Sequence, residues 1–238
     1  LCLESTAPGS TCGEALTLGA VMADGRLCGA CGLCDSSHFA SAEKEFRFPL
    51  NYGSQRPLSA SWTVTGSGSL CIGTKSEVQS HITGMTPGRI VDYGLKDSMN
   101  MGACMAPAAA DTVARHMEDF HVTPEEYDRI ITGDLGSVGQ TVLIDLLREK
   151  GIDIADRHMD CGIEIFDAEA QDTHAGGSGC GCSAVTLAAY ILPKLESGEW
   201  KKVLFLPTGA LLSKTSFNEG KSVPGIAHAV VLESPAVK

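Results

Sequence analysis

The sequence predicts an α/β protein, because segments with strand and helix periodicity alternate along the chain. A glycine-rich bend also leads directly into an apolar helical segment at two places, residues 9–23 and 174–195. Each of these helices is followed by a turn, a short apolar strand, a loop of small residues and a second strand. We interpret this repetition as a duplicated βα unit, with two helix N-termini in comparable positions.

The first unit begins at the bend Gly9-Ser10-Thr11-Cys12. We expect a helix over 13–23 and a strand over 27–33, then a loop at 35–38. A second strand is expected at 62–72, where glycines mark close backbone approach.

The second unit begins at the bend over residues 174–183. It predicts a helix over 184–195, a strand over 202–206, a small-residue loop at 208–210 and a closing strand over 225–232. A helix that starts at such a bend exposes backbone N–H groups and a partial positive charge, so each bend is a potential anion site.

Between the two units we expect strands over 78–85, 129–132 and 161–166 and helices over 105–120 and 138–150. Gly133 and Asp134 follow a buried strand at its carboxyl end, where α/β proteins usually bind ligands. Asp134 could instead only cap the following turn. We divide the chain into the remainder of a first half, residues 1–75, and a second half, residues 76–238.

Composition excludes several classes of function. The net charge of −11 and the lack of a Lys/Arg run argue against a nucleic-acid or anionic-membrane surface. No apolar run is long enough to span a membrane, and no signal peptide opens the chain. Most of the ten cysteines lie in apolar or glycine-rich stretches, which indicates free thiols in a reducing cytosol.

Two cysteine patterns need a closer reading. Cys28, Cys31 and Cys34 have the spacing of an iron–sulfur triplet, but on a strand Cys31 would face away from the other two, which favours core packing. We interpret Cys180 and Cys182 as small residues of a tight turn rather than as a redox or metal-binding pair. Their position at a helix N-terminus should lower the pKa of a thiol there.

Several long strings of residues resemble a known family. They are Ser36-Ser37-His38, Thr63-Val64-Thr65-Gly66-Ser67-Gly68, Met105-Ala106-Pro107-Ala108-Ala109-Ala110-Asp111-Thr112, Thr132-Gly133-Asp134-Leu135, Ala175-Gly176-Gly177-Ser178-Gly179-Cys180, Thr208-Gly209-Ala210-Leu211-Leu212-Ser213 and Ile226-Ala227-His228. With them the chain resembles the thiolase superfamily and, within it, the stage V sporulation protein AD family of spore-forming bacteria. That family has a further N-terminal segment, which we expect to be missing here.

The thiolase resemblance implies two similar halves in αβαβα layers, with a pocket where two helix N-termini meet. The catalytic Cys of thiolases aligns with Gly9, and the family's two histidines fall at Gly133 or Asp134 and within 179–182. We therefore expect no catalysis, because glycine supplies neither a thiolate nor a base. A misalignment that makes Cys12 the nucleophile is the alternative.

The sporulation resemblance implies a protein that binds dipicolinic acid, alone or as its calcium chelate, without a cofactor. It also implies peripheral placement on the cytoplasmic face of the forespore inner membrane, beside other membrane proteins of the stage V sporulation A set, and leaves a homodimer open. The rival interpretations are an acyl-CoA or acyl-carrier-protein condensing enzyme and a scaffold with a vestigial pocket. The pocket is expected to comprise Gly9, Ser10, Ser36, His38, Asp134, His174, Cys180, Gly181, Cys182 and His228.

Overall fold

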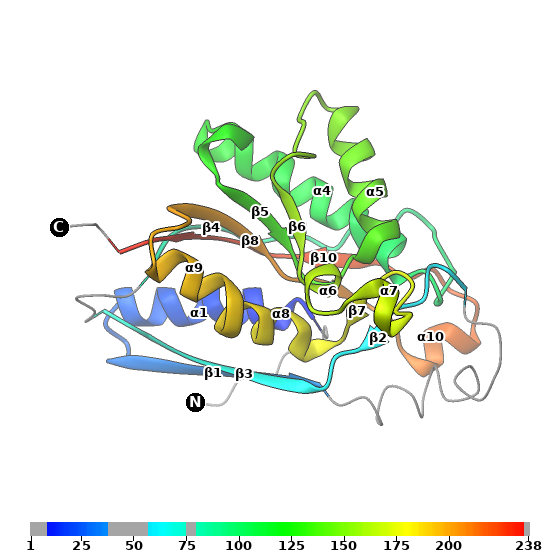
Figure 1. The fold of residues 1–238 in the computed structure, drawn as a ribbon, viewed down its shortest axis with the longest axis horizontal. Coiled ribbons are helices and arrows are strands. Elements are labelled where there is room, and N and C mark those ends of the chain that lie inside the picture. Colours follow the sequence, from blue (N-terminus) through cyan, green and yellow to red (C-terminus); the bar gives the residue numbers. More distant parts are fainter. Residues whose placement is uncertain (1–8, 38–56, 75–79, 236–238) are drawn as a thin grey trace.

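The structure is a computed structural model that describes residues 9–37, 57–74 and 80–235. Its elements lie in layers (Figure 1). Helices α4 (Met101–Phe120) and α5 (Gly136–Arg148) cover one face of a five-stranded sheet. Helix α1 (Thr11–Asp24) and a helix that begins with α8 (Cys180–Thr186) cover the other face, and a two-stranded ribbon lies beyond them.

The five-stranded sheet has the order β4–β11–β8–β5–β6. Its strands are β4 (His81–Thr86), β11 (Ala229–Glu233), β8 (Lys202–Leu206), β5 (Arg129–Thr132) and β6 (His158–Asp160). Strands β8, β5 and β6 are parallel, whereas β11 is antiparallel to both of its neighbours. The apolar runs predicted as strands at 129–132 and 202–206 are therefore confirmed as its centre.

Two hydrophobic clusters cover the two faces of this sheet. In β8, Val203 and Phe205 join the cluster that faces α1 and α8, while Leu204 and Leu206 join the cluster under α4 and α5. A strand that is buried on both faces needs apolar residues at every position, which is why its sequence shows no alternation.

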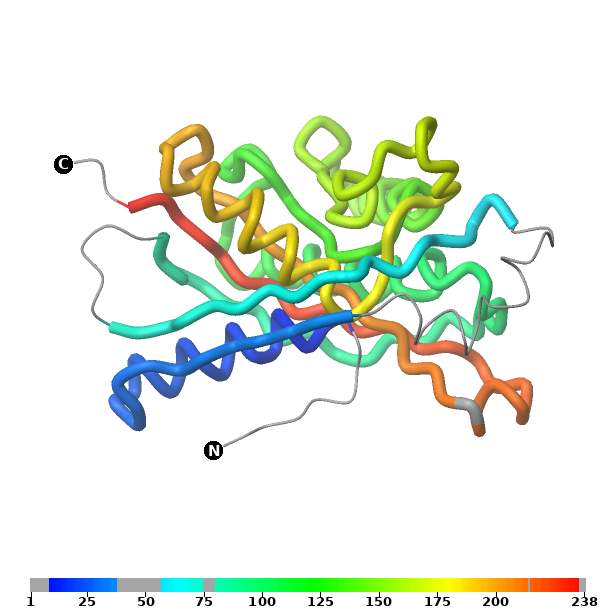
Figure 2. Tube along the Cα trace, turned by 60° about the horizontal axis from the view of Figure 1, so that its bottom comes forward, coloured from blue at the N-terminus to red at the C-terminus, as the bar shows by residue number. Residues whose placement is uncertain are grey.

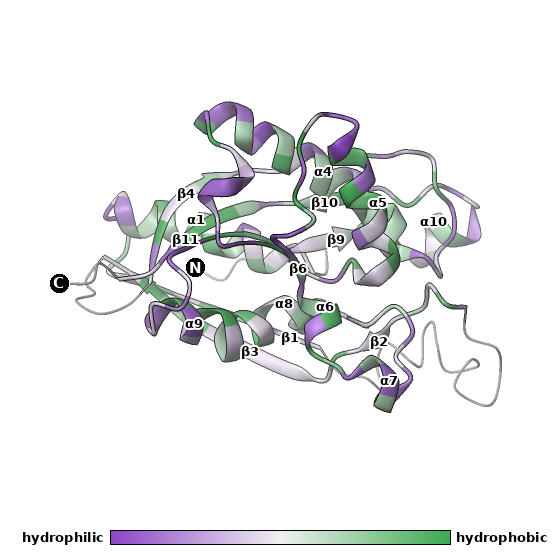
Figure 3. Ribbon diagram, turned by 45° about the horizontal axis from the view of Figure 1, so that its top comes forward, coloured by the Kyte–Doolittle hydropathy of each residue, from purple (hydrophilic) through white to green (hydrophobic). Residues whose placement is uncertain are grey.

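The helix that starts at α8 continues through a π-helical turn, η3 (Leu187–Ile191), into α9 (Leu192–Glu196). Its apolar residues face the sheet and α1 (Figure 3). The prediction of a helix over 184–195 is confirmed, with an earlier start at Cys180.

The ribbon pairs β1 (Ala30–Ser37) with β3 (Gly66–Gly73) in antiparallel register and runs alongside α1 (Figure 2). The prediction of a loop at 35–38 is wrong for the described residues, because β1 extends to Ser37. In both units a helix precedes a strand that pairs with an antiparallel partner, β1 with β3 and β8 with β11. This order is the one that the duplicated pattern predicts.

The prediction of a strand over 161–166 is also wrong, because β6 ends at Asp160 and a short helix, α6 (Cys161–Glu164), follows it. The Asp160 side chain accepts a hydrogen bond from the Gly162 N–H at 3.1 Å and so begins this helix. The remaining short elements are β2 (Trp62–Thr63), η2 (Pro124–Glu126), α7 (Ala168–Gln171), β7 (Gly177–Ser178), β9 (Thr208–Ala210), α10 (Lys214–Asn218) and β10 (Gly225–Ala227).

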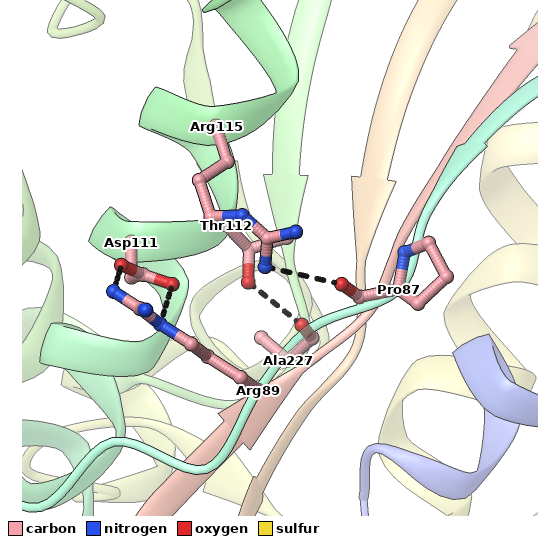
Figure 4. Close-up of polar contacts among 6 residues, drawn as sticks. All are labelled: Pro87, Arg89, Asp111, Thr112, Arg115 and Ala227. Atoms are coloured by element: carbon pink, nitrogen blue, oxygen red, sulfur yellow. Dashed lines mark hydrogen bonds and ion pairs between the residues drawn. The ribbon is translucent and has the colours of Figure 1, made fainter. Parts of the chain in front are cut away.

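Three polar contacts fasten the segment after β4 and the strand β10 to α4 (Figure 4). Arg89 makes a two-pronged ion pair with Asp111, with nitrogen–oxygen distances of 2.9 and 2.6 Å. Thr112 donates to the carbonyl of Ala227 at 2.9 Å, and Arg115 donates to the carbonyl of Pro87 at 3.5 Å. No helix in the described part of the chain is long and apolar enough to cross a membrane.

Candidate functional site

The bend before α1 and the bend before α8 meet. The backbone N–H of Gly9 hydrogen-bonds to the thiol of Cys180. A Cβ atom added to Gly9 would lie 3.6 Å from Oδ1 of Asp134, and it would collide with the carbonyl oxygen of Thr208. We call Gly9, Asp134, Cys180 and Thr208 the Gly9 site.

Gly9 has a positive φ of 96°, a conformation that other residues adopt only with strain. The Thr208 carbonyl fills the space where a side chain at position 9 would begin. Both observations allow only glycine here. A nucleophilic side chain could therefore be present at this position only if Thr208 moved.

Asp134 lies between the two bends, with an exposed fraction of 9%. Its carboxylate accepts from the Gly179 N–H at 3.1 Å and from the Thr208 hydroxyl at 2.9 Å. The Thr208 hydroxyl in turn accepts from the Asp134 N–H at 3.1 Å. A carboxylate of the chain itself thus occupies the N-terminal end of α8, where an external anion was expected. Asp134 thus bonds to the residue before α8, whereas the N–H groups of the turn that follows Asp134, in Leu135 and Gly136, bond to Asp160 and not to Asp134 as the cap interpretation expected.

Cys180 is the half-buried thiol of the site. Burial raises its pKa above the ordinary value, and the negative charges of Asp35 and Asp134 raise it further. The hydrogen bond from Gly9 opposes this rise without reversing it. The expected lowering of the pKa at the helix N-terminus is wrong, because burial and two carboxylates raise the pKa of Cys180, so the thiol keeps its proton near neutral pH.

Asp35 brings a second carboxylate to the site from β1. Its side chain accepts a hydrogen bond from the Thr11 hydroxyl at 2.7 Å, and burial raises its pKa. Two residues further, Ser37 accepts from the N–H of Gly181 at 3.1 Å and donates to the carbonyl of Val64. The sequence interpretation missed both roles. The period of two in a strand would have placed Asp35 and Ser37 on one face, had residues 35–37 been read as a strand.

Ser36, which was predicted to line the pocket, is exposed on the opposite face of β1. Ser10 is fully buried next to Gly9. Gly181 packs so closely against Ser37 and Gly66 that a Cβ atom would lie 2.7 Å from the Ser37 nitrogen.

Cys182 does not line the site. Its side chain is fully buried in the cluster between the sheet and α8, and burial raises its pKa well above the usual value. Its thiol lies 3.7 Å from the carbonyl oxygen of Gly133. Cys12 is equally buried, with a pKa raised to about 12, which is the opposite of what a nucleophile needs.

The histidines have structural partners. His174 donates to the carbonyl of Pro57 at 2.9 Å, which holds the loop of His174 against the segment that contains Pro57. His228 accepts from the Gly88 N–H at 3.1 Å and packs beside Gly13 in the first turn of α1. Burial lowers the pKa of His228. His38 lies outside the described residues.

Asp160, which the sequence analysis did not single out, holds the loop that carries Asp134. Its buried carboxylate accepts from the N–H groups of Leu135 and Gly136 at 2.9 and 3.0 Å, and from the Thr132 hydroxyl at 2.6 Å. Burial raises its pKa, and these hydrogen bonds oppose the rise. The position of Asp134 therefore depends on Asp160.

Among the described residues, no group of three or more histidine, cysteine or acidic side chains could hold a metal ion. An open hollow of about 870 Å³ lies elsewhere, between the segment after β4 and α10, and contains none of the predicted pocket residues. Its lining includes Asp92, Lys96, Leu211 and Lys221.

Comparison with known proteins supplies the family. The model of the stage V sporulation protein AD (SpoVAD) family matches residues 5–233. The chain belongs to this family. It is 42% identical over 225 residues to the stage V sporulation protein AD of Bacillus subtilis (strain 168), an alignment that covers 94% of the chain. The chain spans 66% of the length of that relative.

Solved structures show the same thiolase-like fold. A point variant of OleA from Xanthomonas campestris matches 96% of this chain and 64% of its own, at a TM-score of 0.64 and 12% identity. The 3-oxoacyl-(acyl carrier protein) synthase III (FabH) of Pseudomonas aeruginosa PAO1 matches all of this chain and 68% of its own, at a TM-score of 0.57 and 11% identity. These likenesses confirm the predicted fold and carry no function.

Proposed function

We propose that the chain binds dipicolinic acid, as its calcium chelate, at the Gly9 site and leaves it chemically unchanged. In this proposal the binding serves dipicolinate uptake into the developing spore, at the cytoplasmic face of the inner membrane and together with membrane proteins of the same sporulation set. Membership of the SpoVAD family supports the sporulation role. The observation that carries the binding proposal is the carboxylate of Asp134 at the junction of the two bends.

The chemistry of the Gly9 site disfavours acyl transfer. Gly9 offers no nucleophile, and Cys180 keeps its proton because burial and two carboxylates raise its pKa. The resemblance to condensing enzymes implies a histidine at position 133 or 134, yet Asp134 stands there. A carboxylate next to a developing oxyanion raises the energy of the transition state, whereas condensation needs donors at that point.

The same charges select the form of the ligand. Asp134 and Asp35 lie near Cys180, and both act on the Cys180 thiol through their negative charge. A free dicarboxylate would meet this charge and be repelled. Calcium binds carboxylate oxygens and takes six to eight oxygen ligands, so a chelate can present its cation to the two side chains. Here calcium is part of the ligand.

The test is isothermal titration calorimetry of the 238-residue chain with three titrants: calcium dipicolinate, dipicolinate with a calcium chelator, and calcium chloride alone. We expect saturable binding of the first that is about tenfold tighter or more than of the others, a difference of about 1.4 kcal/mol. Asp134→Asn should weaken binding of the chelate by a similar factor. The matched control is Ser36→Ala, because Ser36 is exposed on the far face of β1.

Three results would contradict the proposal. If free dipicolinate bound as tightly as its calcium chelate, Asp35 and Asp134 would not be selecting the calcium form. Unchanged binding by Asp134→Asn would place the ligand elsewhere. Release of coenzyme A from an acyl donor by the purified chain would favour the condensing enzyme.

A further inference from the structure

Two thiols touch at the end of the fold far from the Gly9 site. The Sγ atoms of Cys28 and Cys31 lie 2.8 Å apart, in the turn that joins α1 to β1. Both side chains are partly exposed. Cys31 and Cys34 lie in a strand, β1, as predicted, but Cys28 precedes it and the turn brings it onto Cys31. The predicted core packing is wrong, because none of the three side chains is buried.

The register of the ribbon separates this pair from the other thiols nearby. Cys31 lies opposite Ile72, and both side chains face Gly19 of α1, since a Cβ atom there would lie 3.5 Å from Cys31 Cβ. Cys71 lies opposite Gly32, one position along, and so points to the other face of the ribbon. Cys28 is therefore the thiol that is best placed to react with Cys31.

Cys34 has partners of its own. Its thiol lies 3.1 Å from the hydroxyl of Ser69 and 3.6 Å from that of Ser67, both on β3. Cys34 follows Cys31 by an odd number of positions on the same strand, which places it on the opposite face. It does not compete with Cys28 for Cys31.

We propose that Cys28 and Cys31 form a reversible disulfide by exchange with a low-molecular-weight disulfide. A thiolate of the pair attacks one sulfur of the small disulfide, whose S–S bond breaks and releases one thiol. The second cysteine then attacks the mixed disulfide and releases the second thiol. The protein loses two electrons and two protons, and the small disulfide gains them.

The 2.8 Å contact places each sulfur within reach of the other, so either cysteine can attack first and the other can resolve the mixed disulfide. The pair also lies at the closed end of the α1–β1 hairpin. The open end of this hairpin carries Thr11 and Asp35, which border the Gly9 site.

The experiment titrates the reduced 238-residue chain with mixtures of reduced and oxidised glutathione. Acid quenching, alkylation of free thiols and trypsin digestion release peptide 27–44, which contains Cys28, Cys31 and Cys34. We expect a form that is lighter by two hydrogens and alkylated only at Cys34. It should be about tenfold more abundant than any other internal disulfide at partial oxidation.

Variants make the outcome decisive. Cys34→Ser should leave the disulfide intact. Cys28→Ser should abolish it and trap glutathione on Cys31, and Cys31→Ser should abolish it and trap glutathione on Cys28, with circular dichroism to show that each variant folds. Linkage of Cys31 to Cys34 or Cys71, or the absence of any preference among the thiols, would overturn the proposal.

Discussion

Replacement of Asp160 by alanine should destabilise the protein severely, because two of the buried backbone N–H groups that bond to its carboxylate have no other partner among the described residues. Its carboxylate accepts from the N–H groups of Leu135, Gly136 and Gly162. The Gly162 N–H also reaches the Gly133 carbonyl at 3.1 Å, so it keeps a partner. Two backbone donors lose theirs, at about 1–3 kcal/mol each, which predicts a loss of about 2–6 kcal/mol in the free energy of unfolding.

Urea denaturation followed by circular dichroism measures this loss. With a slope of about 2 kcal/mol per molar urea, the midpoint of Asp160→Ala should fall by about 1–3 M. Asp160→Asn is the matched control. The asparagine oxygen can still accept from Gly136 and Gly162. The amide nitrogen would then face the Leu135 N–H, which loses its acceptor, and the Thr132 hydroxyl, which can rotate to accept.

Asp160→Asn should therefore cost less than Asp160→Ala, about 1–3 kcal/mol. If the alanine variant loses less than about 1 kcal/mol, or if the asparagine variant is the less stable of the two, the Asp160 carboxylate does not hold these N–H groups as described. A second readout follows the loop itself. Because Asp160 positions Asp134, the alanine variant should also bind calcium dipicolinate less tightly than Asp160→Asn does.

Three further predictions concern other parts of the chain. Burial lowers the pKa of His116 and of His158 from 6.5 to about 4, so the unfolded chain takes up protons first as pH falls. The contribution of neutral His116 to the free energy of unfolding is complete above pH 6.5 and is lost as pH falls toward 4, a loss of about 2–3 kcal/mol. The melting temperature should therefore be lower at pH 5 than at pH 7. Gly9→Cys should destabilise the fold by about 2–3 kcal/mol and yield no thioester turnover, as thermal melting and a coenzyme A release assay will show. Maleimide should alkylate Cys34, whose pKa two serine hydroxyls lower, well before Cys180, as peptide mapping will report.

Each of these expectations has an outcome that contradicts it. An unchanged melting temperature between pH 7 and pH 5 would mean that His116 is not held neutral by the fold. A Gly9→Cys variant of wild-type stability would show that the Thr208 carbonyl moves aside freely. Faster alkylation of Cys180 than of Cys34 would show that the helix dipole outweighs burial and the two carboxylates.

The sequence alone could predict those parts of the fold that depend on local pattern. The apolar runs that became β5 and β8 and the glycine-rich bends before α1 and α8 are visible in single segments. The convergence of the two bends followed from the duplication and from family resemblance. No local pattern could have provided it.

Contacts between distant segments could not be predicted in this way. Asp35 and Ser37 resembled a loop because aspartate and serine are common in turns, although pairing with β3 holds them in a strand. Asp160 serves a loop 25 residues earlier in the chain, and its role depends on complete burial. Cys182 and Cys180 are close neighbours in the chain, yet only the structure shows that one lies in the core and the other at the site.

The Thr208 carbonyl above Gly9 bears on how this branch of the fold can evolve. The obstacle is main chain, held by the pairing of Thr208 with Ala227, so no substitution at position 208 removes it. A cysteine at position 9 would meet this carbonyl for as long as β9 keeps its pairing. Placing a thiol there would therefore require β9 and residue 9 to change together.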